Sequence, residues 1–101
     1  MFTTTNKNTS AVTHGRFKNL IIEADAEGDY NVTLNYEEGY LNGEEFVPLG
    51  VNHVIAKNKA AYTDDEGNEI PEETGYTDFL TTVMATGGSL ENTETFIQGL
   101  I

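Results

Sequence analysis

The stretch FKNLIIEADAEGDYNVTLNY, residues 17–36, decides the fold of this chain because it contains two strand patterns joined by a turn. Leu20, Ile21 and Ile22 form an aliphatic run typical of a strand buried on one or both faces. Residues 26–29, Ala-Glu-Gly-Asp, supply turn chemistry. The second half alternates apolar and polar residues without error, which predicts one buried and one solvated face. The apolar members are Tyr30, Val32, Leu34 and Tyr36.

Further strands are expected downstream of this hairpin. Asn42-Gly43 is the favoured pair for a type I′ hairpin turn, and residues 46–55 read as a third strand region. Pro48 lacks a backbone donor, so it predicts an edge, a bulge or a break within that region. Residues 59–63 and 69–70 flank a polar turn, and they predict a hairpin with little apolar material that projects from the body.

The end of the chain changes from a strand period to a helical one. Five apolar residues occur at i, i+3, i+4, i+7 and i+8, which is one face of a helix: Tyr76, Phe79, Leu80, Val83 and Met84. Thr77 or Asp78 is expected to cap the start, and Gly87-Gly88 to stop the helix. A strand is the alternative, because the threonines in this segment are poor helix formers.

A last helix is predicted after Ser89, which is a good N-cap residue. Leu90, Ile97 and Ile101 would share one face of that helix, with Phe96 and Leu100 nearby. An apolar ending of this kind predicts that the carboxy end is docked against other residues.

The predicted fold class is α+β and mainly β. A chain of 101 residues allows one domain with a modest core. We expect a small antiparallel β-sheet or sandwich with one or two short C-terminal helices. Residues 1–16 contain no run that can bury a face, so they are expected to form an extended or disordered basic arm, and residues 17–101 a small acidic β-rich domain.

The charge distribution separates the two parts. The net charge is −12, and the first acidic residue is Glu23. The acidic body repels nucleic-acid phosphates, so direct binding of DNA or RNA is not expected. The basic arm can instead lie on an acidic surface of its own body, of a neighbouring copy or of another protein; a frayed terminus is the alternative. The candidate partner-contact residues are Phe2, Lys7, Val12, Arg16 and Lys18.

No pattern in the chain predicts catalysis, a cofactor or a metal. Residues 23–29, EADAEGD, place oxygen ligands as the first half of an EF-hand loop does, but the twelfth position is Leu34 where a bidentate Glu is needed. An acidic hairpin turn is the favoured interpretation. The chain has no cysteine, and no apolar run approaches the roughly 18 residues of a membrane span, so no membrane partner is expected.

Other residue groups are better explained by packing or solvation than by a site. Seventeen acids on a small surface produce close carboxylate pairs by chance, so Glu37/Glu38 and Glu44/Glu45 do not predict a glycosidase. Two histidines, His14 and His53, are too few for a metal cluster. Tyrosines are favoured at interfaces, although packing in a sheet is the more common use; those in the strands are Tyr30, Tyr36 and Tyr40.

The segment FTTTNKNTSAVTHGRFKN, residues 2–19, resembles the Thr/Asn/Lys-Asn segments of short virion proteins of tailed bacteriophages. The acidic, cysteine-free body with its DDEGNEIP turn is similar in style to phage head, neck and tail accessory proteins. The resemblance implies a non-enzymatic structural subunit of a viral particle, assembled in the host cytoplasm. Its partners would be other virion proteins and copies of itself, contacted through the N-terminal arm and apolar surfaces.

Two further hypotheses come from the acidic residues. The first is an inhibitor that mimics DNA and occupies the basic groove of a host defence protein, although the acids are spread over several turns and the basic lead works against that use. The second is a small metal- or ligand-binding module at the turn from Glu23 to Asp29.

Overall fold

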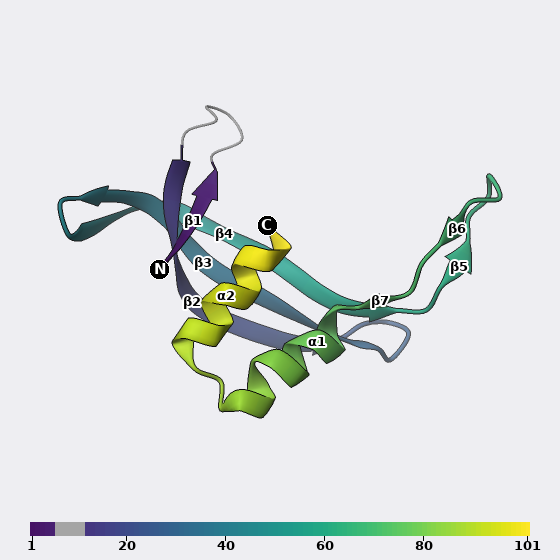
Figure 1. The fold of residues 1–101 in the computed structure, drawn as a ribbon. Coiled ribbons are helices and arrows are strands. Elements are labelled where there is room, and N and C mark those ends of the chain that lie inside the picture. The colour runs from purple at the N-terminus through teal and green to yellow at the C-terminus, as the bar shows by residue number, and fades with distance from the viewer. Residues whose placement is uncertain (6–11) are drawn as a thin grey trace.

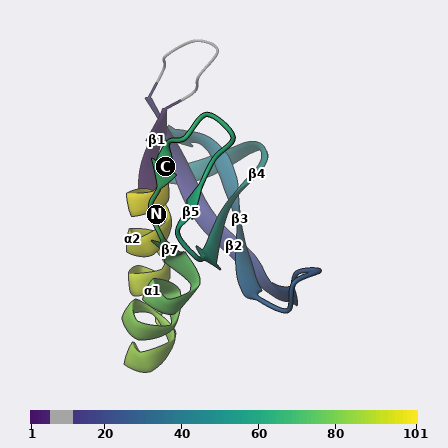
Figure 2. The ribbon, with the colours of Figure 1, turned by 90° about the vertical axis from the view of Figure 1, so that its right-hand side faces the viewer.

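The computed structural model describes residues 1–5 and 12–101, and it contains one antiparallel sheet with helices on one face (Figures 1 and 2). The strand order in the sheet is β1-β2-β3-β4-β7. The strands are β1 Phe2–Thr5, β2 Val12–Ala24, β3 Tyr30–Asn42, β4 Glu45–Lys59 and β7 Glu73–Thr74. A separate two-stranded ribbon contains β5 Tyr62–Thr63 and β6 Glu69–Ile70. The helices are α1 Gly75–Thr82, the 3₁₀ turn η1 Met84–Thr86 and α2 Leu90–Leu100.

The α+β, mainly β fold class is confirmed, and the β part is a single sheet with no second sheet packed on it in the described part of the chain. The hairpin expected at residues 17–36 forms within β2 and β3 of this sheet. Leu20 pairs with Leu34 and Ile22 with Val32. The turn between the strands is closed by a hydrogen bond from the N–H of Asp25 to the carbonyl of Asp29, 2.7 Å long.

Pro48 lies at a bulge, one of the three outcomes expected from its missing donor. Glu38 of β3 pairs with Gly50, and the next residue of β3 pairs with Pro48, so that Leu49 is the extra residue of β4. The proline occupies a strand whose outer side lies open here, where the missing N–H costs no ladder hydrogen bond. The bulge therefore lets β3 and β4 continue as a pair to the turn at residues 43–44.

The core lies between the sheet and the two helices. Val32, Leu34 and Tyr36 point from β3 toward the helices, as the alternation of that strand predicts. The helices contribute Phe79, Val83 and Ile97, and β4 contributes Ala56. Phe79 packs edge-on against Phe96, with ring centroids 5.7 Å apart, and this contact joins α1 to α2.

Both predicted helices form, with one correction to their caps. Ser89 caps α2 as expected, since its hydroxyl accepts a hydrogen bond from the N–H of Asn92 (3.1 Å). The expectation that Thr77 or Asp78 caps α1 is wrong, because the helix begins one turn earlier, with Thr74 at the N-cap. Asp78 lies inside the first turn, where its carboxylate accepts from the Thr74 hydroxyl (3.3 Å).

The apolar face expected for α2 is only partly buried. Ile97 is fully buried and Phe96 half-buried, whereas Leu90 and Ile101 are more than half exposed. These two residues lie at the ends of the helix, beyond the part that packs on the sheet. The carboxy end is therefore docked through the middle of α2 and not through its last residue.

The N-terminal residues are part of the sheet, which differs from the separate arm expected for residues 1–16. β1 pairs with the first residues of β2, so the expected boundary at residue 17 falls inside a strand. Phe2 is 5% exposed, and its ring packs edge-on against Tyr36, with centroids 5.3 Å apart. Gly15, the strand partner of Phe2, makes this possible because it leaves room for the ring.

Substitution of Gly15 by alanine should destabilise the protein by expelling the Phe2 ring. The new Cβ would lie 2.4 Å from Cε2 of Phe2, so the ring must move, at a cost of about 1–3 kcal/mol in the free energy of unfolding. Gly50→Ala is the control in denaturant unfolding, because a Cβ there meets nothing within 4 Å. Equal losses in the two variants would contradict this role of Gly15.

Candidate interaction surfaces

The five residues predicted to contact a partner have different placements. Phe2 is a core residue, and Lys7 lies outside the described residues. Val12 is the first residue of β2 and pairs with Thr5. Arg16 and Lys18 are exposed on β2. Because Phe2 is buried in its own core, it is not a free anchor; the contact role of the others stays a prediction.

Arg16 is held on the sheet surface by two neighbours. Its Nη2 donates to Oε1 of Glu37 at 3.0 Å, across the β2–β3 pair. Its guanidinium carbon lies 4.6 Å from the centroid of the Phe46 ring, a cation–π distance. Exposed ion pairs contribute about 0–1 kcal/mol, so these contacts orient the Arg16 side chain more than they stabilise the fold.

Glu94 of α2 is a buried carboxylate that the sequence reasoning missed. It is 5% exposed, and its Oε1 accepts from the amino group of Met1. Its Oε2 accepts from the backbone N–H of Phe17 at 2.9 Å, next to the register shift between Phe17 and Asn19. A buried charge is costly unless it is paired, so Glu94 ties α2 to both ends of the N-terminal hairpin. The available signal was a glutamate at i+4 from Leu90, within the apolar stripe of α2.

Replacement of Glu94 by glutamine should lower the free energy of unfolding by about 1–3 kcal/mol. The amide can still accept from Phe17, but it carries no charge to pair with the amino group of Met1. Glu91→Gln, an exposed position on the same helix, is the matched control. Denaturant unfolding measures both variants, and a loss no larger in Glu94→Gln than in the control would argue against the tie.

One face of the sheet carries the helices, and the opposite face is open in the described part of the chain (Figure 2). The residues of β3 that alternate with its buried ones point to this open face, and their strand partners on β2 and β4 point the same way. Ile21 and Ile55 both pair with Thr33 there, and they are 48% and 53% exposed. We call this the open sheet face; its members are Asn19, Ile21, Glu23, Asn31, Thr33, Asn35, Glu37, Val51, His53, Ile55, Lys57 and Arg16.

The outer edge of β4 is also open over most of its length. β7 pairs only with Asn58 and Lys59, and no other described strand pairs with that side of β4. The backbone groups on that side of β4 between Phe46 and Ile55 therefore have no partner in a described strand. Unpaired edges of this kind are where a further strand can add to a sheet.

The two acidic turns of the chain have the same geometry. Asp25 Oδ1 accepts from the N–H groups of Glu27 (2.9 Å) and Asp29 (3.0 Å). In DDEGN, residues 64–68, Asp64 Oδ1 accepts from Glu66 (3.0 Å) and Asn68 (2.8 Å) in the same way. The first aspartate of each turn therefore has a structural use, which supports the hairpin interpretation of residues 23–29. Oxygens of Asp25, Glu27 and Asp29 lie within 4.8 Å of one another, but all three residues are exposed.

The turn at Asp64 should respond to acid. The N–H of Asn68 donates to its carboxylate, and this bond is the main reason that the pKa lies below its ordinary value of 3.8. Because the pKa is lowered in the folded protein, the ionised carboxylate stabilises the turn at every pH above the ordinary pKa. This stabilisation is lost as the pH falls through the lowered pKa.

An NMR titration of the intact protein checks this expectation. The amide shifts of Glu66 and Asn68 should change with a midpoint below pH 3.8, and Asp64→Asn should remove that change while keeping an acceptor oxygen. A midpoint at or above the ordinary value would contradict the expectation.

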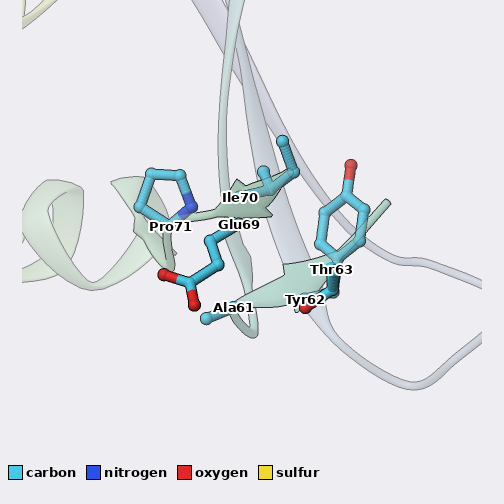
Figure 3. A pocket seen from close by; sticks show the side chains of 6 residues that line it. All are labelled: Ala61, Tyr62, Thr63, Glu69, Ile70 and Pro71. Carbon is cyan, nitrogen blue, oxygen red and sulfur yellow. The ribbon is translucent and has the colours of Figure 1, made fainter. Parts of the chain in front are cut away.

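Two hollows of the surface contain none of the carboxylate pairs or histidines considered in the sequence analysis. One hollow of about 360 Å³ lies on the β5–β6 ribbon, where the Tyr62 ring and Ile70 point to one side and Glu69 is its only carboxylate (Figure 3). A larger groove of about 700 Å³ runs along α1 and α2 and is lined by threonines, Phe96 and Leu100. Neither contains a histidine or a pair of carboxylates, so the described geometry offers no acid–base constellation at these places.

The remaining candidates are dispersed over the sheet. Tyr36 is buried, and its pKa is raised by that burial and by the nearby Glu38. Tyr30 stacks on Tyr76, with centroids 6.0 Å apart, and Tyr40 is exposed. Glu44 and Glu45 lie at the β3–β4 turn; His14 and His53 are opposite Gly39 and Asn35 of β3.

Comparisons of the chain with models of protein families, with curated proteins and with solved structures found no significant match. Roles are therefore assigned to residues from their geometry and chemistry alone. No helix in the described part of the chain has the length and apolar character needed to cross a membrane.

Proposed function

We propose that the protein is a non-catalytic structural subunit of a larger assembly, of the tailed-phage particle type that its N-terminal segment resembles. The observation that carries this proposal is the balance of apolar residues between core and surface. Among the described side chains, eight apolar ones form the core, whereas fifteen large apolar ones are exposed. Where such residues are neighbours, as Ile21 and Ile55 are on either side of Thr33, exposed apolar surface is typical of a site that binds another protein.

The extended shape supports the same proposal. The radius of gyration is 15.8 Å, against about 13 Å for a compact domain of this length. The accessible surface is 6797 Å², against roughly 5,700 Å² for a compact monomer of 11.1 kDa. The end of the β3–β4 hairpin and the β5–β6 ribbon project from opposite ends of the body (Figure 1). These two projections add little to the core of the subunit, and in an assembly they can contact neighbouring subunits.

The positions of the exposed apolar residues indicate where neighbours bind. Leu49 is 68% exposed at the bulge on the open edge of β4, and Val51 is on the open sheet face. Leu41 lies near the tip of the β3–β4 hairpin. Neighbouring subunits and other particle proteins are therefore expected to bind the sheet and this hairpin, which are apolar surfaces of the kind that the resemblance implies in addition to the N-terminal arm.

Two measurements test the proposal: the oligomeric mass of the protein and its presence in purified particles. The intact chain should form multimers in light scattering or native mass spectrometry, and it should co-purify with particles. Leu49→Gln should weaken assembly without loss of folding stability, because it removes exposed apolar surface at the open edge. Leu90→Gln on α2, at similar exposure, is the control. A protein that stays monomeric and is absent from particles would refute the proposal.

A further inference from the structure

We propose that the open sheet face binds the same face of a second copy, with the two β3 strands on a two-fold axis. Glu23 then faces the partner's Lys57, and Ile21 faces the partner's Ile55. This inference rests on the proposed role as an assembly subunit and specifies one contact of that assembly.

The first argument is the charge of the face. The chain has 17 acidic and 5 basic residues, and two copies of a protein with net charge −12 repel each other over most of their surfaces. The open sheet face differs from the rest, because its charged residues are two acids and two bases: Glu23, Glu37, Arg16 and Lys57. It is a surface without net charge through which two such copies can approach.

The second argument is the order of residues across the three strands. Asn31 of β3 lies between Glu23 of β2 and Lys57 of β4, and we call such a set of three paired residues across the strands a row. Both charged residues are exposed, and neither is in an ion pair with another described residue. One row further along, Thr33 lies between two isoleucines, one on each flanking strand. These two rows therefore have complementary or matching residues on their two sides, whereas the rows through Asn35 and Glu37 do not.

Rotation about an axis along β3 exchanges the two sides of each row. It places β2 of one copy over β4 of the other and keeps the rows aligned, so that unlike charges meet in the first row and isoleucines meet in the second. Each contact occurs twice, as in any isologous interface. Two sheets that pack in this way lie about 10 Å apart with strands crossing at about 30°, a small enough angle for long side chains to stay in reach.

The other two-fold arrangement is less complementary. In this arrangement the two-fold axis runs perpendicular to the strands through the middle of the face. It places β2 of one copy over β2 of the other and reverses the order of the rows. Glu23 would then lie near the partner's Arg16, but Ile21 would lie over the partner's Asn19 and Ile55 over the partner's His53. This order places apolar side chains on polar ones, and Arg16 already has a partner in Glu37. The arrangement with parallel strands places Arg16 over the partner's Val51 and Glu37 near the partner's Glu37, but it matches both the charged row and the isoleucine row, and we favour it on those two rows.

The contact is expected to be weak in isolation. The face spans three strands and about seven residues along each, a flat footprint of roughly 350 Å² from strand spacing and rise. Stable interfaces bury about 800 Å² per partner. We therefore expect a dimer with a dissociation constant in roughly the micromolar range, strengthened where neighbours in an assembly hold the two copies together.

Charge reversal tests the pairing. In sedimentation velocity of the intact protein, Glu23→Lys or Lys57→Glu alone should weaken dimerisation by roughly tenfold or more. The double variant Glu23→Lys/Lys57→Glu should restore dimerisation, and its net charge is still −12. Glu91→Lys on α2 is the control for the single charge change. If the double variant does not restore dimerisation, the proposed pairing of Glu23 with the partner's Lys57 is wrong. If Arg16→Glu restores dimerisation of Glu23→Lys, the two-fold axis does not run along β3.

A cross-link tests the same face without changing its charge. The chain has no cysteine, so Thr33→Cys introduces a single thiol beside the proposed axis. A bismaleimide that spans about the 10 Å between packed sheets should join two copies of this variant, whereas Thr95→Cys on the exposed side of α2 should give no such product. Equal products from the two variants overturn the proposal. Multimers that persist in the charge-reversed single variants would leave the assembly role standing and refute this contact.

Discussion

The alternation of β3 is the constraint on which the rest of the structure depends. Val32, Leu34 and Tyr36 lie under the helices, and because paired residues of neighbouring strands share a face, they also determine which residues of β2 and β4 are covered. Two short helices cover one face of a sheet whose strands are 13 to 15 residues long at its centre. The other face is therefore left to solvent or to a partner.

A second set of contacts joins the two ends of the chain. Phe2 packs in the space over Gly15, and Glu94 of α2 bonds to Met1 and to the backbone of Phe17. Beside them, the hydroxyls of Thr4 and Thr13 are buried and bonded to each other. These groups have no local reason to be ordered, since each needs a residue far away in the sequence or in a neighbouring strand. Burial of the first strand thus depends on the last helix.

Local patterns predicted what local chemistry decides. The alternation after residue 30, the bulge at Pro48 and the cap at Ser89 each follow from neighbours in sequence. Burial of Phe2 could not be predicted in this way, because it requires a glycine on the paired strand. The open sheet face could not be predicted either, since its composition appears only when three strands are in register. The proposed contact surface therefore adds the sheet to the N-terminal arm predicted from the sequence, and Arg16 is part of both.

The position of the basic residues follows from this register. Arg16 is bonded to Glu37, and Lys57 is at the opposite end of the row that begins with Glu23. The chain has few basic residues, and two of them, Arg16 and Lys57, lie among the apolar residues of the open sheet face. They lower the negative charge of this face, which also has exposed apolar area. Elsewhere several acids lie on two turns, where Asp25 and Asp64 bond to the backbone. Glu94 on α2 is buried and bonded to the N-terminal hairpin. The excess of negative charge thus opposes contact between copies over most of the surface, whereas the open sheet face has equal numbers of acids and bases.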